Sequence, residues 1–119
     1  MMMSKPVDAV TIRWTADATG RITFFNRDWT NYTGVADAEV YGSADAWISC
    51  VHPDDQALVR AMWSSRALEA DSYVVRFRLL GHDGIFRPFQ GVAVPVRDGG
   101  AVASWAGYCE SVESARDAR

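Results

Sequence analysis

The sequence contains few of the residues that build disulfide frameworks and metal centres, with two cysteines and two histidines among 119 residues. Small secreted domains are stabilised by several disulfides, whereas a chain of this length can bury an apolar core of its own. We therefore interpret Cys50 and Cys109 as reduced thiols of a single domain, and we expect a cytoplasmic location.

Long apolar runs and blocks of one charge are also missing. No stretch approaches the roughly eighteen apolar residues of a membrane span. Residues 1–10, MMMSKPVDAV, lack the apolar region of a secretory signal. Twelve basic residues face fifteen acidic ones, and the basic residues form no cluster. These absences argue against a membrane span in this chain and against a nucleic-acid-binding function.

Apolar and aromatic bulk is plentiful. Hydrophobic residues make up 49% of the chain, and five Trp, five Phe and four Tyr supply large side chains for a core. Residues 1–8 are expected to be a lead-in, and residues 9–112 to form the domain. The polar end, residues 113–119, is expected to begin a linker, as in a module of a longer protein.

Turn residues divide the first half of the chain. Residues 9–15 and 21–25 are rich in β-branched and aromatic residues and predict a hairpin around the turn 16–20. Asn26 is expected to cap a short helix that ends at Gly34. Short helical pieces around Gly42 and Trp47 are expected to follow, over residues 35–51.

The longest predicted helix covers residues 53–69. Apolar residues recur on one side at helical spacing, which indicates the face that packs against the core. That apolar stripe consists of Leu58, Val59, Met62, Trp63 and Ala67.

The second half of the chain alternates with a period of two. Residues 71–80, 85–97 and 101–112 predict three strands, joined by turns at 81–84 and 98–100. Short turns make these strands antiparallel neighbours, and the first hairpin must join the same sheet, since isolated hairpins are marginal. The predicted fold class is therefore α+β, a five-stranded antiparallel sheet with helices packed on one face.

The ordered series of motifs resembles a PAS domain of the sensory-box type that ends in a PAC-like motif, over about residues 9–112. The residues that carry this resemblance are Trp14-x-x-Asp17-x-x-Gly20, Phe25-Asn26-x-x-Trp29, Tyr32-Thr33-Gly34, Trp47, Val51-His52-Pro53-Asp54-Asp55, Tyr73, Arg76-x-Arg78, Asp83-Gly84, Arg87-x-Phe89, Pro95-Val96-Arg97-Asp98, Gly100 and Trp105-x-Gly107.

The resemblance implies a signalling module without catalysis of its own. Such domains bind small ligands between sheet and helices, or mediate dimerisation. They pass the signal to an output domain such as a histidine kinase or a cyclase. These properties are what the resemblance implies, and composition does not show them.

Two positions depart from the family's pattern. Pro88 stands where the family usually has Trp, and its missing N–H indicates an edge strand, a bulge or an N–H position that faces no partner. Ser111 stands where the family often has an Asp that ties the domain to the outgoing helix. The usual link to the output is therefore in doubt.

The segment Cys50-Val-His-Pro-Asp-Asp55 gathers groups that could bind a metal or act as a nucleophile and base. A helix start explains most of them: Pro53 suits the first helical position, and Asp54 and Asp55 favour the positive end of the dipole. Asp55 is expected to reach back to the His52 N–H in a capping box. A zinc site needs three or four converging ligands, and a Cys50–His52 catalytic pair has poor geometry. No catalytic or metal residues are therefore assigned.

Four aromatic residues, Trp63, Tyr73, Phe77 and Trp105, are candidate walls of a noncovalent ligand pocket, although filling the core is the favoured explanation for them. The cofactor is not identified. Flavin-binding relatives use a cysteine in an Asn-Cys-Arg-Phe-Leu-Gln stretch that this chain lacks, so covalent flavin is not expected. Haem-binding relatives commonly use a histidine on the long helix, and residues 53–69 contain none, so this mode of haem ligation is not expected either.

Two remaining residues have simpler explanations. His82 lies in the turn 81–84 and is expected to be solvated, and Cys109 in the last strand is expected to be a small core residue. Residues Val92, Val94 and Val96 share one face of the strand 85–97, and Tyr73, Val75, Phe77 and Leu79 share one face of the strand 71–80. We predict a homodimer through one face of the sheet or through the N-terminal segment.

Overall fold

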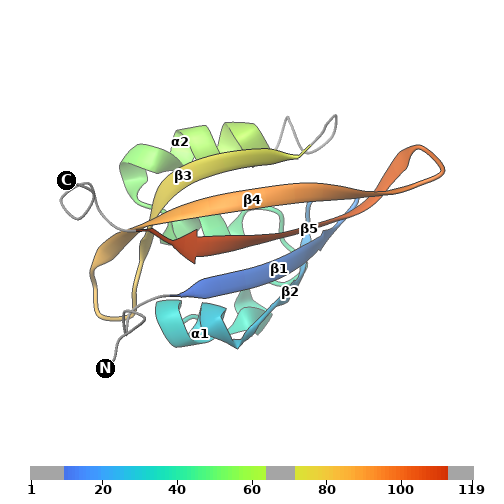
Figure 1. Cartoon of the computed structure of the whole chain (residues 1–119). Helices are drawn as coiled ribbons and strands as arrows, with labels where there is room; N and C mark the ends of the chain where they lie inside the picture. The colour runs from blue at the N-terminus through green and yellow to red at the C-terminus, as the bar shows by residue number, and fades with distance from the viewer. Residues whose placement is uncertain (1–9, 64–71, 113–119) are drawn as a thin grey trace, which may run out of the picture.

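Five antiparallel strands form the framework of the computed structural model, which describes residues 10–63 and 72–112 (Figure 1). The strands run in the order β2-β1-β5-β4-β3. Their bounds are Thr11–Asp17 (β1), Ile22–Phe25 (β2), Tyr73–Leu80 (β3), Phe86–Asp98 (β4) and Ala101–Ser111 (β5). The predicted α+β class and the five-stranded antiparallel sheet are confirmed.

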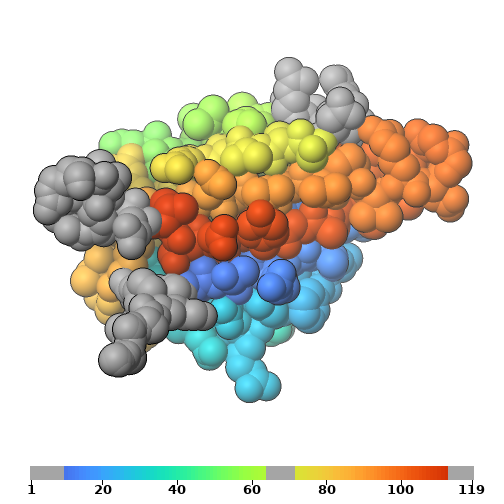
Figure 2. Space-filling view, in the orientation of Figure 1, coloured from blue at the N-terminus to red at the C-terminus, as the bar shows by residue number. Residues whose placement is uncertain are grey.

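The helical segments all lie between β2 and β3 in the chain. They are Arg27–Thr33 (α1), Asp37–Glu39 (η1), Ala46–Cys50 (η2) and Pro53–Ala61 (α2). Figure 1 shows α1 and α2 behind the sheet, on one of its faces. Figure 2 shows the opposite face, where β3, β4, β5 and β1 run side by side without a helix in front of them.

Buried and exposed side chains alternate along the strands, as the period of two in the sequence predicts. In β1, Ile12, Trp14 and Ala16 are buried against the helices, while the residues between them are more open. The turn after β1 is held by Asp17, whose carboxylate accepts hydrogen bonds from the N–H groups of Thr19 and Arg21, both at 3.0 Å. The predicted hairpin is confirmed, but its turn covers residues 18–20, because β1 extends to Asp17, two residues beyond its predicted end.

The β4–β5 hairpin closes through two glycines. Gly99 and Gly100 have φ values of 63° and 94°, and a two-residue turn with positive φ at both positions matches the twist of the flanking strands. The strand before the turn reaches Asp98, one residue beyond its predicted end. The hairpin itself follows the prediction.

Helix α1 begins and ends at the predicted residues, but its start is held differently. Asn26 occupies the capping position without a capping hydrogen bond from its side chain. Its amide Nδ2 instead donates to the Thr11 carbonyl of β1 at 3.1 Å. At the other end, Gly34 adopts φ 76°, where a β-carbon would lie 3.0 Å from that of His82. The capping role predicted for the Asn26 side chain is therefore wrong, and the stop at Gly34 is confirmed.

Helix α2 keeps only part of the predicted apolar stripe buried. Val59 and Trp63 are 2% and 5% exposed, whereas Leu58 is 54% exposed. Successive residues of a helix lie about 100° apart around its axis. Because Val59 faces the sheet, its neighbour Leu58 faces solvent. The α-helix ends at Ala61, Met62 and Trp63 form a wider π-type turn, and residues 64–69 of the prediction lie outside the described residues.

Pro88 lies in an interior strand, since β4 runs between β5 and β3. The register shift in β4 is at Val96/Arg97, so the edge position and the bulge expected for Pro88 are both wrong. Its carbonyl accepts from the Val112 N–H at 3.0 Å, just where β5 ends. A strand residue points its nitrogen to the same side as its carbonyl, so the missing donor affects only this last rung.

Ser111 ties the two ends of the domain together. Its hydroxyl accepts from the Val10 N–H, and its own N–H donates to the Val10 carbonyl, both at 2.9 Å. It thereby joins the segment before β1 to the end of β5. A link to the outgoing segment falls on residues 113–119, which lie outside the described residues.

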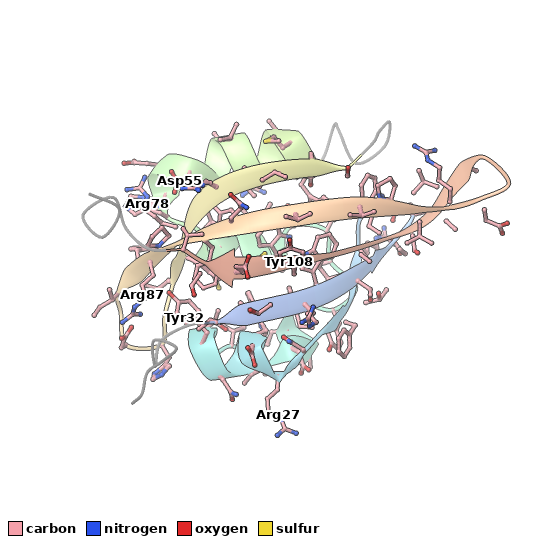
Figure 3. All side chains as sticks on the ribbon, viewed as in Figure 1. Arg27, Tyr32, Asp55, Arg78, Arg87 and Tyr108 are labelled. Atoms are coloured by element: carbon pink, nitrogen blue, oxygen red, sulfur yellow. The ribbon has the colours of Figure 1, made fainter. Side chains whose placement is uncertain are left out.

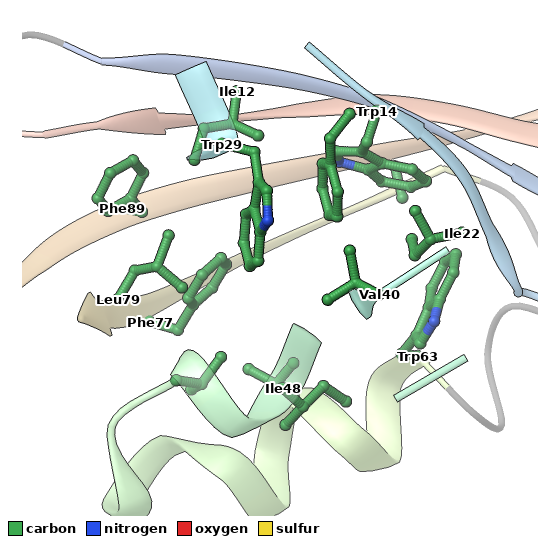
Figure 4. Close-up of a cluster of buried hydrophobic side chains, with 14 of the residues drawn as sticks. Ile12, Trp14, Ile22, Trp29, Val40, Ile48, Trp63, Phe77, Leu79 and Phe89 are labelled. Atoms are coloured by element: carbon green, nitrogen blue, oxygen red, sulfur yellow. The ribbon is translucent and has the colours of Figure 1, made fainter. Parts of the chain in front are cut away.

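Large aromatic and aliphatic side chains fill the space between the sheet and the helices (Figure 4). Trp29, Trp105, Phe89 and Ile48 are each at most 1% exposed. Gly107 in β5 makes room for this packing, because a β-carbon there would collide with the Val92 carbonyl and lie 2.6 Å from the Trp14 ring. The core is therefore dense, and a small cavity remains within it.

Candidate ligand cavity

A cavity of about 40 Å³ lies between the inner face of the sheet and the helices. It exceeds the roughly 10–15 Å³ that one water molecule needs, and it is smaller than the roughly 150 Å³ of a cavity that holds benzene. Its aromatic walls come from β1, β2, α1, η2, β3 and the turn after α2. They are Trp14, Phe25, Trp29, Trp47, Trp63, Tyr73 and Phe77.

Three of the four aromatic residues singled out in the sequence lie in this wall. Trp63, Tyr73 and Phe77 line the cavity. Trp105 does not, and instead packs behind the wall, with ring centroids 5.9 Å from Trp63 and 6.3 Å from Tyr73. Trp29 and Trp47 also line the cavity, and sequence reasoning did not select them, because a tryptophan that fills a core and one that faces a cavity look alike in sequence.

Trp63 is fixed in place by its surroundings. Its indole N–H donates to the Ala44 carbonyl at 2.9 Å, and its ring meets Trp14 edge to face at 5.4 Å. A β-carbon at Gly20 would lie 3.5 Å from the same ring. This end of the cavity is therefore bounded by a side chain that has no free hydrogen-bonding group.

Other tryptophans of the core do have free donors. Within the described residues, the buried Nε1 atoms of Trp29, Trp47 and Trp105 have no hydrogen-bond partner, and neither does the Oδ1 atom of Asn26. Buried polar groups are normally paired, and an unmade hydrogen bond costs about 1–3 kcal/mol. Trp29 and Trp47 contribute to the cavity wall, while their Nε1 atoms are themselves buried.

The polar groups of the wall are otherwise few. Tyr73 and Cys109 line the cavity, and burial raises the pKa of the Tyr73 hydroxyl and raises the pKa of the Cys109 thiol to about 12. Both groups therefore stay protonated at neutral pH. Among the residues the structure describes, the cavity wall contains no acidic or basic side chain.

The segment from Cys50 to Asp55 performs structural tasks, though partly by other bonds than expected. The Asp54 N–H donates to His52 Nδ1 at 3.0 Å, which caps α2. The expected capping box is wrong, because the Asp55 carboxylate accepts hydrogen bonds from Arg78 instead. The donors are the backbone N (2.9 Å), Nε (2.9 Å) and Nη2 (2.8 Å) of Arg78. The His52 N–H donates to the Arg78 carbonyl at 2.8 Å. Figure 3 shows Asp55 and Arg78 together beside β3.

These hydrogen bonds connect the start of α2 to β3. The hydrogen bonds from Arg78 hold the pKa of Asp55 below its usual value. Cys50, at the end of η2, packs against the core without lining the cavity, and burial raises its pKa. Within residues 10–63 and 72–112, no three His, Cys, Asp or Glu side chains lie together as metal ligands would.

A second polar cluster joins α1 to the β3–β4 turn. The Tyr32 hydroxyl donates to the Leu79 carbonyl at 2.7 Å, and the His82 N–H donates to the Tyr32 carbonyl at 2.7 Å. Arg87 pairs with Asp83 at 2.7 Å and lies 5.9 Å from the centre of the Tyr32 ring (Figure 3). The side chain of His82 is exposed, as expected for a turn residue.

The PAS fold family matches residues 22–109, well over half of the chain. The chain belongs to the PAS fold family. PAS domains are sensory domains of signalling proteins such as histidine kinases and cyclases, and they are typically not catalytic.

Solved PAS domains have the same fold at low sequence identity. A domain of a proposed light and redox sensing histidine kinase from Haloarcula marismortui aligns with a TM-score of 0.72 and 17% identity, over 90% of this chain and 93% of that one. The N-terminal domain of a diguanylate cyclase with PAS/PAC sensor from Marinobacter aquaeolei gives 0.69 and 22%, over 83% and 92%.

A third structure contains a ligand. The PAS domain of the RpfR quorum-sensing receptor from Cronobacter turicensis, in complex with C12:0, aligns with a TM-score of 0.66 and 20% identity, over 93% of this chain and all of that one. Identities at this level show the fold alone. A search of the curated proteins finds no match to this chain.

The helices of the described residues are short and amphipathic. None of those within residues 10–63 and 72–112 is long and apolar enough to cross a membrane.

Proposed function

We propose that this PAS domain is the sensory module of a bacterial signalling protein and passes its state to an attached or partner output domain, such as a histidine kinase or a cyclase. Its membership of the PAS fold family supports this role, as do the similar domains of a histidine kinase and a diguanylate cyclase. The module itself carries out no catalysis. It works in the cytoplasm.

The input is a noncovalent small molecule bound in the interior cavity. The observation that carries this proposal is the cavity itself, which lies between the sheet and the helices and is lined by aromatic and aliphatic side chains with few polar groups. Ligand sites in proteins are typically concave and mostly apolar, with a small number of polar groups. A small molecule in this space buries apolar surface against these walls.

The shape of the cavity favours a small molecule over a large cofactor. A volume of about 40 Å³ has no room for a flavin or a haem in this arrangement of the walls. Cys50, flanked by Ser49 and Val51, does not line the cavity, so it is not placed to bond a flavin there.

An enzymatic role for Cys50, His52, Asp54 and Asp55 has less support. His52 Nδ1 is occupied by the helix cap, and Asp55 is paired with Arg78. A nucleophile also needs a base within hydrogen-bonding reach. The ring nitrogen with which His52 would act as a base is Nδ1, and this atom already accepts the capping hydrogen bond.

The domain is further proposed to form a homodimer through the sheet or the N-terminal segment. The inner side of β3, with Phe77 and Leu79, is buried under the helices and cannot serve as an interface. On the open side, Val74, Val94 and Val96 are 56%, 46% and 45% exposed. An apolar surface left open in this way is typical of an interface.

Mass spectrometry tests the presence of a resident ligand. The domain is purified from cells of its own source organism without added ligand, and its mass is measured under native and then denaturing conditions. We expect the native species to be heavier than the polypeptide and to release a small molecule on denaturation. A colourless sample with the bare polypeptide mass under both conditions would argue against the ligand.

A further inference from the structure

The first residues of β1 are held differently from the rest of the strand. β1 pairs with β2 only from Trp14 onward, because β2 ends at Phe25. Before Trp14, side chains at the start of α1 replace the neighbouring strand. Asn26 Nδ2 donates to the Thr11 carbonyl at 3.1 Å, and the Thr11 N–H donates to Asp28 Oδ2 at 3.3 Å. On this side, the start of β1 therefore depends on two side-chain hydrogen bonds.

On the other side, the pair Val10 and Ser111 is also irregular. Residues of a hydrogen-bonded antiparallel pair normally exchange two backbone bonds. Here the Ser111 N–H donates to the Val10 carbonyl, but the Val10 N–H donates to the Ser111 hydroxyl, both at 2.9 Å. We call these two bonds the Val10–Ser111 clamp. The end of β5 is held independently, because the Val112 N–H donates to the Pro88 carbonyl of β4 at 3.0 Å.

The Val10–Ser111 clamp lies close to the interior cavity. Ile12 pairs with Cys109 on the same two strands, two residues along from the clamp, and both side chains line the cavity. Trp29 also lines it and belongs to α1, the helix that holds the start of β1. Figure 4 shows Ile12 and Trp29 within the same buried cluster. Parts of the wall from β1, β5 and α1 therefore meet near the clamp.

An occupant larger than the cavity must displace part of its wall. The cavity has a volume of about 40 Å³ and is surrounded by buried side chains. Packed side chains transmit such a displacement, and it opens the segment with the weakest local support. The start of β1 has a neighbouring strand on one side only, and its other side is held by side chains. We therefore expect displacement of Ile12 and Cys109 to reach the Val10–Ser111 clamp.

We propose that the Val10–Ser111 clamp couples the cavity to the two ends of the domain. An occupant that displaces Ile12 and Cys109 opens the clamp and releases the start of β1 from the end of β5. Ser111 is the positioning residue, because its hydroxyl accepts the hydrogen bond that holds the Val10 N–H. This inference rests on the proposed function, since it assigns a regulatory device to the same cavity.

Amide hydrogen exchange of residues 1–119, followed by ¹H–¹⁵N NMR, tests the opening of the clamp. Ala93→Leu places a larger side chain in the cavity wall and serves as the probe for an occupied cavity. We expect the Val10 N–H to exchange about fivefold faster in this variant, as the loss of one hydrogen bond predicts. The control is the Arg21 N–H, which is bonded to Asp17 at the other end of β1 and should exchange at an unchanged rate.

Unchanged exchange of the Val10 N–H in a folded Ala93→Leu domain would overturn the proposal. Cys109→Met is the second variant that enlarges a side chain of the wall. It decides in the same way if Ala93→Leu does not fold.

Substitutions at Ser111 test the hydroxyl itself. Ser111→Ala removes the acceptor, so it should speed exchange of the Val10 N–H about fivefold, and Ala93→Leu should then add no further change. Ser111→Thr keeps a hydroxyl and should behave as the wild type. Ser104→Ala is the control in the same strand, because the Ser104 hydroxyl has no hydrogen bond within the described residues. If Ala93→Leu accelerates exchange equally with and without the Ser111 hydroxyl, Ser111 has no coupling role.

A cyclase chimera separates this proposal from the proposed function. Residues 1–119 replace the sensor domain of the Marinobacter aquaeolei diguanylate cyclase, and the cyclase rate is measured with Ala93→Leu, Ser111→Ala and both substitutions. We expect Ala93→Leu to change the rate severalfold when Ser111 is present and to have no effect beside Ser111→Ala. An equal effect in both backgrounds supports sensing by the cavity and overturns the clamp. No effect in either background overturns both proposals.

Discussion

The carboxylate of Asp55 connects two elements that are far apart in the chain. It accepts three hydrogen bonds from Arg78, and its side chain is 20% exposed. Substitution Asp55→Asn should lower the free energy of unfolding by about 1–2 kcal/mol at pH 7, after allowance for solvent screening. Urea unfolding followed by tryptophan fluorescence measures this loss.

The same pair predicts a pH dependence. Arg78 lowers the pKa of folded Asp55 below its ordinary value of 3.8, so its stabilisation is complete above that value and is lost as the pH falls through the lower folded pKa. The difference in free energy of unfolding between the wild type and Asp55→Asn should therefore become smaller below about pH 4. Asp54→Asn is the control and should cost only the helix-dipole contribution of about 0.3–1 kcal/mol. Equal losses in both variants would contradict this account.

What the sequence predicts about single residues depends on how local their bonds are. Pro53 and the helix start after it could be predicted, because the dipole and the missing N–H act within one turn. The partner of Asp55 could not, since Arg78 is 23 residues away in another element. The unpaired N–H of Trp29 could not be predicted either, because it depends on which groups surround the ring in the folded core.

At the scale of elements, β5 depends on one glycine that is not in a turn. Gly107 pairs with Trp14 of β1 and Ala93 of β4, and a β-carbon would overlap the Val92 carbonyl and the Trp14 ring. Gly107→Ala should destabilise the domain by about 1–3 kcal/mol through overpacking. Thermal unfolding measures the change. Ala103→Ser, at an exposed site of the same strand, should stay within about 0.5 kcal/mol, and a similar loss in both would refute the packing argument.

The element pattern was predictable where periodicity is strong. Alternating residues predicted β3, β4 and β5, and turn chemistry placed the hairpins. The strand order was not derivable from local pattern: β5 lies in the middle of the sheet between β1 and β4. That placement is why Pro88, expected at an edge or a bulge, lies instead in an interior strand at the last rung of β5.

At the scale of the whole molecule, the open face of the sheet predicts association. Light scattering at high micromolar concentration should give the mass of a dimer. Val94→Glu places a charge on the open face and should shift the domain to monomer, whereas Leu58→Glu, equally exposed on α2, should not. A monomeric wild type would remove the dimer prediction, and unchanged dimers in Val94→Glu would exclude this face.

The central claim is that the contents of the cavity set the state of an output domain. A chimera tests it most directly: residues 1–119 replace the sensor domain of the Marinobacter aquaeolei diguanylate cyclase, which has the same fold. Ala93, 2% exposed and in the cavity wall, is changed to Leu to fill the space, and Val94→Leu on the open face is the control. We predict that Ala93→Leu changes the cyclase rate severalfold and makes it independent of added cell extract, while Val94→Leu behaves as the unmodified chimera. Equal rates and equal responses to extract in all three chimeras would contradict the claim.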